Sequence, residues 1–293
     1  MSKIDLHECM MVDGAKLLRL LGSGKSGEVW YALAENNAVV ALKIYTGKDE
    51  VKDRAYHEYS MADRFKHDNI LAPLGISSFE SHPVIRLPYC EGRSVDGMAA
   101  YFSERMIWKL IEEVSGALAE IHSKGYAHFD IKPSNILWNG QKFMLSDFGA
   151  CMSLGDVSSG KGTADASSYR FDAPEFNTRC CAASDVWSLG ATIFYLYMGC
   201  HVFNGLGGKA QHPGSPVPFM RKSQSKLSLL VQNCLDFDHC KRPTSKVINE
   251  IAQNELMRLK CLSPKRNLRH DADRNIGLVN AEFWPDQMID NNI

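Results

Sequence analysis

The sequence lacks the features that mark several specialised classes of protein. Its nine cysteines include no Cys-x-x-Cys pair, and Cys234 and Cys240 have no histidine partners at zinc-finger spacing. This pattern favours reduced thiols in a cytoplasmic setting over a disulfide scaffold or a metal site. The net charge of −1 gives no electrostatic reason to expect binding to nucleic acid or to an anionic membrane.

Long apolar runs are also missing. The most apolar segment, 189–200, is too short to span a bilayer, and the first residues have no apolar run behind a basic cluster, which argues against a signal peptide. We therefore expect a soluble, intracellular protein, with delivery to another cell left open. The 293 residues are 45% hydrophobic and 23% charged, which is ordinary for a globular fold of one or two lobes.

The densest group of chemically active side chains lies in residues 128–137, which read HFDIKPSNIL. Asp130 can orient a hydroxyl and accept its proton, Lys132 can neutralise a phosphoryl group, and the amide oxygen of Asn135 can help to hold Mg²⁺. Further along, Asp147 begins an Asp-Phe-Gly sequence. Two oxygen ligands from separate segments suit magnesium, which needs few protein groups besides phosphate oxygens and water.

These two motifs, in this order, resemble the catalytic loop and the metal-binding motif of the protein kinase family. The resemblance covers about residues 16–260 and implies an α+β, two-lobed protein-kinase fold. It places a small N-terminal antiparallel sheet plus one helix at about 16–88, and a larger, mainly helical C-terminal lobe at about 92–260. Residues 1–15 are expected to form an N-terminal lead, and residues 261–293 a C-terminal tail that is either loosely docked or held by its aromatic residues.

A glycine-rich turn near the N-terminus has the spacing G-x-G-x-x-G at Gly22, Gly24 and Gly27, with Val29 two residues later. Taken alone, this pattern is as typical of an ordinary hairpin as of a phosphate-binding loop. A Walker loop is excluded because Arg19 stands where it would need glycine, and a strand-like exit argues against a dinucleotide fold. The resemblance implies that the glycines cover the phosphates of ATP and that Val29 also contacts the nucleotide.

Residues 39–45 predict a buried strand that contains Lys43. A lone lysine in a strand usually lies at the solvent face, but Val-Ala-Leu-Lys resembles the kinase motif whose lysine grips the α- and β-phosphates, with Ala41 beside the nucleotide. That lysine needs a carboxylate partner. We select Glu58, in the middle of a helix predicted for residues 50–66; the alternative for Glu58 is a solvated helix charge.

The stretch 84–92 predicts a strand that runs into a loop. It resembles the last strand of the small lobe and the hinge between the lobes, and the alternative is an edge strand that ends at a proline turn. The resemblance places Leu87 at the gatekeeper position, and it implies that backbone groups of Pro88 and Cys90 meet the adenine ring. Proline is tolerable there because only its carbonyl is needed.

Several residues are expected to have structural roles. A long amphipathic helix is predicted for 103–124, with Ser103 as its N-cap. The resemblance implies that Asp185 bonds the backbone of the catalytic loop and that Glu175 and Arg242 form an ion pair that anchors the activation segment.

The motif departs from most regulated family members at Phe129, where they carry an arginine. That arginine collects a phosphate on the activation segment through charge-assisted hydrogen bonds, and phenylalanine cannot. We therefore expect activity that does not depend on phosphorylation of that segment, although Ser158, Ser159 and Thr163 remain possible sites of modification.

The predicted function is transfer of the γ-phosphoryl group of ATP, with Mg²⁺, to a serine or threonine of a protein. Lys132 and Ser168, at the position of the family's substrate-pocket threonine, favour Ser/Thr over tyrosine specificity. The main alternative is a pseudokinase that binds nucleotide or partners without turnover. A kinase for a small molecule or lipid is disfavoured by Ala173-Pro174-Glu175, which serves a peptide-docking segment. The pattern predicts neither the substrate nor the oligomeric state.

Overall fold

The computed structural model describes residues 4–24, 26–46, 51–92, 94–98, 102–156, 168–176, 181–217 and 225–262. The chain divides into one unit of residues 1–256 and a second of residues 257–293, of which 257–262 are described. The predicted C-terminal tail beyond residue 262 and the modification sites Ser158, Ser159 and Thr163 lie outside the described residues.

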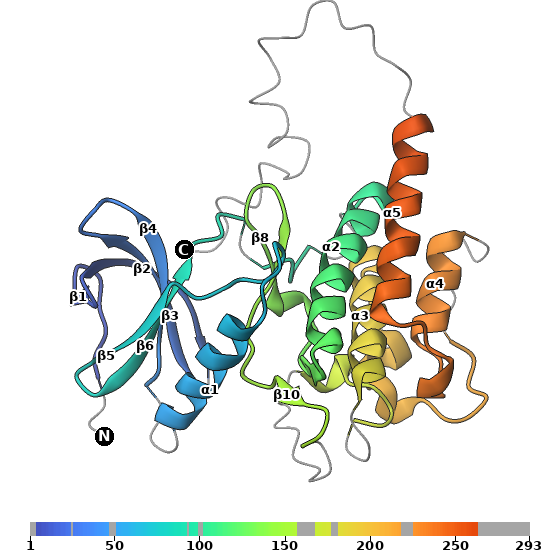
Figure 1. Cartoon of the computed structure of the whole chain (residues 1–293), viewed down its shortest axis with the longest axis horizontal. Helices are drawn as coiled ribbons and strands as arrows, with labels where there is room; N and C mark the ends of the chain where they lie inside the picture. Colours follow the sequence, from blue (N-terminus) through green and yellow to red (C-terminus); the bar gives the residue numbers. More distant parts are fainter. Residues whose placement is uncertain are drawn as a thin grey trace, which may run out of the picture. The chain divides into compact units, whose positions relative to one another are not determined.

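The N-terminal part of the first unit is a six-stranded antiparallel sheet (Figure 1). In spatial order its strands are β1 (Met11–Val12), β2 (Ala15–Gly24), β3 (Gly27–Ala34), β4 (Val39–Ile44), β6 (His82–Pro88) and β5 (Gly75–Phe79). The strand–turn–strand predicted around the glycines is confirmed, since Gly24 pairs with Gly27 across the β2–β3 hairpin. The strands predicted for 39–45 and from residue 84 are confirmed as β4 and β6.

Alternation along the strands gives the sheet two different faces. One face is a continuous apolar core that includes Trp30, Leu42 and Ile44. Val12 and Ala15, from the segment predicted to precede the domain, are fully buried in this core. The opposite face is left for the side chains that alternate with these, among them Lys43.

Helix α1 (Val51–Arg64) confirms the helix predicted in this region. Its buried residues Val51 and Ala55 pack with Tyr45 and Ile85. Both partners lie on the same face of the sheet as Lys43, because Tyr45 is two residues further along the chain and Ile85 pairs directly with Lys43 across the strands. Most of the exposed residues of α1 are charged or polar, so its buried stripe fixes the helix against the sheet.

The remainder of the first unit is mainly helical, so the predicted α+β, two-lobed architecture is confirmed. Its helices are α2 (Glu104–Ser123), α3 (Ala182–Met198), α4 (Lys226–Cys234) and α5 (Ser245–Leu262), the last crossing into the second unit. In Figure 1, α2, α3 and α4 run close together.

Two pairs of short strands lie among these helices. β7 (Tyr126–Ala127) pairs with β10 (Met152–Ser153), and β8 (Ile136–Trp138) pairs with β9 (Phe143–Leu145). The 3₁₀ turns are η1 (Pro133–Asn135), η3 (Ser168–Phe171), η4 (Val202–Gly205), η5 (Gly207–Ala210) and η6 (His239–Lys241).

Helix α2 is the long amphipathic helix predicted from the sequence, and it ends where the site begins. Ser103 caps it as expected, because its side-chain oxygen accepts a hydrogen bond from the Met106 amide. Gly125, in the left-handed conformation at φ 77°, turns the chain away after the last turn. None of the described helices combines the length and hydropathy that a membrane span requires.

Candidate active site

The predicted triad of the central loop lies together between β7 and β8. The ammonium of Lys132 is 2.9 Å from Oδ2 of Asp130. The Asn135 amide nitrogen donates to the Asp130 backbone carbonyl at 2.9 Å and to its carboxylate at 2.8 Å. Because the side-chain nitrogen is used in this way, the side-chain oxygen of Asn135 is the atom that can act as a ligand to a cation.

Asp185 of α3 holds this loop through its backbone, as the sequence predicts. Its two carboxylate oxygens accept hydrogen bonds from the amides of His128 at 2.8 Å and Phe129 at 2.7 Å. Phe129 has φ 61°, a left-handed conformation that is costly for a bulky residue and persists only where the surroundings fix it. The paired bonds to a buried carboxylate supply that constraint.

Lys43, Glu58 and Asp147 meet although they come from β4, α1 and the loop after β9. The Lys43 ammonium lies 2.7 Å from both carboxylate oxygens of Glu58 and 3.5 Å from Oδ1 of Asp147. The contact predicted between Lys43 and Glu58 is therefore present, and the alternative of a solvated Glu58 is wrong, because that residue is only 8% exposed.

The charges of this cluster set its protonation. The Lys43 ammonium lowers the pKa of Asp147, against the opposing effect of burial. Burial acts to lower the pKa of Lys43, but the carboxylates of Asp147 and Glu58 outweigh it and raise that pKa. At neutral pH the cluster thus presents an ionised Asp147 beside a charged Lys43.

The oxygen donors fit magnesium. An ionised Asp147 carboxylate and the Asn135 amide oxygen are hard ligands, and Mg²⁺ takes one or two such groups from a protein while keeping water and phosphate oxygens. The nearby ammonium groups of Lys43 and Lys132 favour polyanionic phosphates. Lys132 is close enough to Asp147 to lower the pKa of its carboxyl.

Predicted nucleotide-binding residues share one face of the sheet. Antiparallel pairing aligns Gly22 with Val29 and Val29 with Lys43, and it aligns Ala41 with Leu87. Residues directly opposite each other in antiparallel strands project to the same side, as do residues two apart along a strand. All five therefore lie on the face from which Lys43 reaches Asp147.

The three glycines of the hairpin are needed for different reasons. A Cβ at Gly27 would lie 2.0 Å from the Ile44 carbonyl oxygen, and its φ is +146°, so the approach of β4 explains this glycine. A Cβ at Gly22 or Gly24 would meet nothing within 4 Å. Internal packing does not account for those two glycines, and their open side is available to a ligand.

The predicted hinge begins where β6 ends at Pro88. Leu87 packs with the cluster of α1 and β6, and Cys90 is buried. Burial raises the pKa of the Cys90 thiol to about 11, so the thiol of this cysteine is neutral at physiological pH. The Gly92 amide then donates to the Trp138 carbonyl at 2.9 Å, which fixes the end of the hinge on β8.

The predicted ion pair between Glu175 and Arg242 is confirmed. The guanidinium donates from Nη1 to Oε1 at 2.7 Å and from Nη2 to Oε2 at 2.9 Å. Burial acts to raise the pKa of Glu175, but the hydrogen bonds and charge of Arg242 reverse this and lower it. Ser168 lies at the start of η3, and its side chain is outside the described residues.

Phe129 lies in a small apolar cluster with Ala127 and Phe176, against which Met152 and Leu154 also pack. The cluster joins the central loop to the residues after Asp147 and to the residue after Glu175. The interpretation of Phe129 as apolar packing is confirmed, and its partners were not predictable from a motif.

Sequence reasoning missed three polar residues near the site. The Tyr45 hydroxyl donates to Oε2 of Glu58, and the spacing of two from Lys43 was a usable signal for a shared face. His122 bonds the Asp185 carboxylate at 2.8 Å. Asp172 is buried, and burial followed by the neighbouring charge of Asp130 raises its pKa to about 6.

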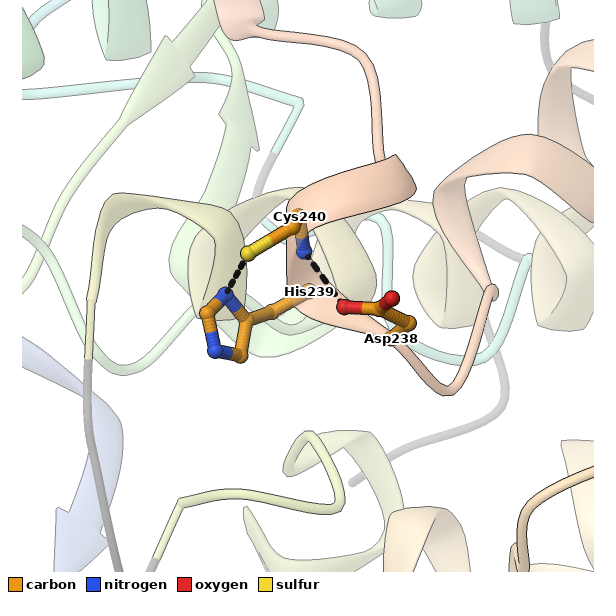
Figure 2. A group of neighbouring side chains, drawn as sticks. All are labelled: Asp238, His239 and Cys240. Atoms are coloured by element: carbon orange, nitrogen blue, oxygen red, sulfur yellow. Dashed lines mark hydrogen bonds between the residues drawn. The ribbon is translucent and has the colours of Figure 1, made fainter.

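A separate group of possible metal ligands lies on η6, where Asp238, His239 and Cys240 have side-chain atoms within 4.8 Å of one another (Figure 2). The Asp238 carboxylate, however, caps the turn by accepting from the Cys240 amide at 3.0 Å, and its other oxygen lies 4.0 Å from the Lys241 ammonium. The arrangement is explained by local capping, and it gives no reason to assign a metal.

Comparison with known proteins extends the likeness over most of the chain. The family model described as protein kinase domain matches residues 15–257. MAP3K epsilon protein kinase 1 of Arabidopsis thaliana is 27% identical over 267 residues, which cover 85% of this chain and 19% of that protein. Serine/threonine-protein kinase nekl-2 of Caenorhabditis elegans is 25% identical over 266 residues, covering 79% and 72%. The chain thus spans about a fifth of the length of the plant relative.

Proposed function

Because the chain belongs to the protein kinase family, we propose that it transfers the γ-phosphoryl group of ATP to a serine or threonine hydroxyl of a protein substrate. The observation that carries this proposal is the convergence of Lys43, Glu58 and Asp147 next to the loop of Asp130 and Asn135. These groups come from distant segments, and their opposite charges at short range suit a site that binds a phosphate–metal complex.

In this proposal the chain's own residues position the reactants. Lys43, held by Glu58, binds the α- and β-phosphates under the cover of the glycine hairpin. Asn135 and Asp147 would hold Mg²⁺, which when bound neutralises charge on the phosphates. Asp130 orients the acceptor hydroxyl and accepts its proton, and Lys132 stabilises charge on the transferring group. The adenine ring would lie against Ala41 and the backbone of Pro88 and Cys90.

The acceptor class is supported by residues of the loop. Lys132 follows Asp130 by two positions, as in Ser/Thr members of the family, and several relatives, nekl-2 among them, are named serine/threonine-protein kinases. A cytoplasmic location without nucleic-acid partners remains the prediction from composition.

We also propose that activity does not require phosphorylation of the activation segment. Phe129 cannot bind a phosphate, and its ring already packs against Phe176 near the end of that segment. An apolar contact of this kind is present without modification. Replacing Ser158, Ser159 and Thr163 together by alanine should leave kcat/KM within a few fold, and a loss of several orders of magnitude would refute this part of the proposal.

The function is tested with Mg²⁺-ATP and a generic protein substrate, by following transfer of labelled phosphate. Wild type should transfer phosphate to serine or threonine, whereas Asp130→Ala and Lys43→Ala should each lose at least about a hundredfold in rate, since each removes a group acting in the transition state. Nucleotide binding without transfer by wild type would favour a pseudokinase.

A further inference from the structure

Glu58 orients the Lys43 ammonium, but this ammonium does not serve Glu58 alone. The Lys43 ammonium is shared between two carboxylates, since Asp147 lies 3.5 Å away while Glu58 lies at 2.7 Å. Two anions therefore compete for one cation. A second hydrogen-bond donor would hold the Glu58 carboxylate in place even though the ammonium is shared.

That second donor is Tyr45, which follows the last residue of β4. Its hydroxyl donates to Oε2 of Glu58, one of the two oxygens that also accept hydrogen bonds from Lys43. Its ring centroid lies 5.4 Å from the Lys43 ammonium, within the range of a cation–π contact. One side chain thus touches both members of the ion pair.

The rest of Tyr45 is fixed independently of Glu58. The residue is 1% exposed and packs with Val51 and Ala55 of α1. Its backbone amide donates to the Pro83 carbonyl at 3.0 Å, and its carbonyl lies 2.9 Å from a ring nitrogen of His82. The hydroxyl is therefore presented from a rigid part of the sheet.

Burial and the neighbouring Glu58 carboxylate raise the pKa of Tyr45 far above its ordinary value. The hydroxyl consequently stays protonated, and it serves as a donor wherever Glu58 is ionised.

We propose that Tyr45 is a positioning residue, which holds Glu58 of α1 in place so that Lys43 remains aligned for the phosphates of ATP. This inference rests on the proposed function for its kinetic consequence, but the bond between Tyr45 and α1 exists independently of catalysis. Among the described residues, only Lys43 and Tyr45 donate a hydrogen bond to the Glu58 carboxylate.

The chain offers a matched pair of variants. Tyr45→Phe removes the hydroxyl and retains the packed ring. Tyr59→Phe makes the same chemical change on α1, in a residue that packs against the same cluster and whose hydroxyl has no hydrogen-bond partner among the described residues. A general effect of losing a tyrosine hydroxyl would appear in both variants.

The first measurement is steady-state kinetics at varied ATP, with enzyme concentration corrected for the folded fraction. Tyr45→Phe should raise KM for ATP about fivefold to tenfold with a smaller change in kcat, because loss of a bond to a charged group weakens binding of the phosphates. A purely structural role would lower the folded fraction and leave KM unchanged. Equal KM values for Tyr45→Phe and Tyr59→Phe would overturn the proposal.

The second measurement is amide hydrogen exchange, which does not depend on catalysis. The amides of α1 should exchange about tenfold faster in Tyr45→Phe than in Tyr59→Phe, whereas those of α2 should be unchanged. If wild type transfers no phosphate, the proposed function fails and exchange alone decides: faster exchange in α1 supports the role of Tyr45, and equal exchange in the two variants overturns it.

Discussion

Arg242 fixes the segment that ends at Glu175, and the structure allows the loss of stability on replacing Arg242 to be predicted. The Arg242 side chain is completely buried and donates five hydrogen bonds. Two go to Glu175, and the others go to the carbonyls of Ala183 at 2.9 Å, Asp236 at 2.8 Å and Phe237 at 3.2 Å. Replacing Arg242 by alanine removes all of them and leaves a buried carboxylate without its cation.

Removal of one partner of a buried pair typically costs about 3–5 kcal/mol, and the unmet carbonyls place Arg242→Ala at the upper end of this range. For a domain of this size, each kcal/mol lowers the melting temperature by about 2–4 °C. We therefore expect a drop of about 10–20 °C in Tm, measured by calorimetry or dye fluorescence, with a matching fall in the urea midpoint.

Two comparisons sharpen this test. Arg242→Lys keeps the charge but cannot form the paired bonds, so it should lose an intermediate amount of stability. The folded-state pKa of Glu175 is lowered from 4.5, so the pair contributes stability above that pH and loses it as the pH falls through the folded value. The difference between wild type and Arg242→Ala should accordingly shrink at acid pH. A loss below about 1 kcal/mol at pH 7 would contradict the role assigned to this pair.

Three further variants test other elements of the site. Gly27→Ala should reduce stability strongly, because its Cβ would lie 2.0 Å from the Ile44 carbonyl oxygen, whereas Gly22→Ala should fold normally and change chiefly the affinity for ATP; equal melting temperatures for the two would refute the distinction. Asp172→Asn should stabilise the protein at pH 8 by up to about 3 kcal/mol, since a folded-state pKa of about 6 against an ordinary 3.8 means that the charged form is penalised. That gain should decline below about pH 6 and vanish near pH 4 in urea unfolding measured across this range, and a gain independent of pH would show that the charge is not responsible.

The residues of the catalytic loop could be predicted because each belongs to a short motif. Asp130, Lys132 and Asn135 are close in sequence, so local geometry brings them together, and Asp147 is tied to them by family resemblance. Glu58 has no such motif. Its choice depended on its place in the middle of a predicted helix, ahead of a segment that resembles the family's next turn and strand, and α1 does bring it to Lys43.

The contacts that could not be predicted from the sequence depend on how distant segments pack against one another. Alternation along the strand places Tyr45 on the side of Lys43, but its bond to Glu58 exists only because α1 packs at one particular height on the sheet. His122 likewise bridges Asp185 and Ser245, which are far away along the chain. The partners of Phe129 come from segments on both sides of the undescribed residues 157–167. No local pattern specifies such contacts.

Successive residues of β4 face opposite sides of the sheet, and this limits where residues can be inserted or deleted. Lys43 stands between Leu42 and Ile44, both fully buried in the opposite core. Inserting or deleting one residue upstream within the strand would reverse the facing of every residue beyond it. An ammonium would then point into the apolar core, and a leucine would point toward the proposed nucleotide site. Lineages related to this chain should therefore vary in length at the β3–β4 turn around residues 35–38 and keep β4 free of insertions and deletions.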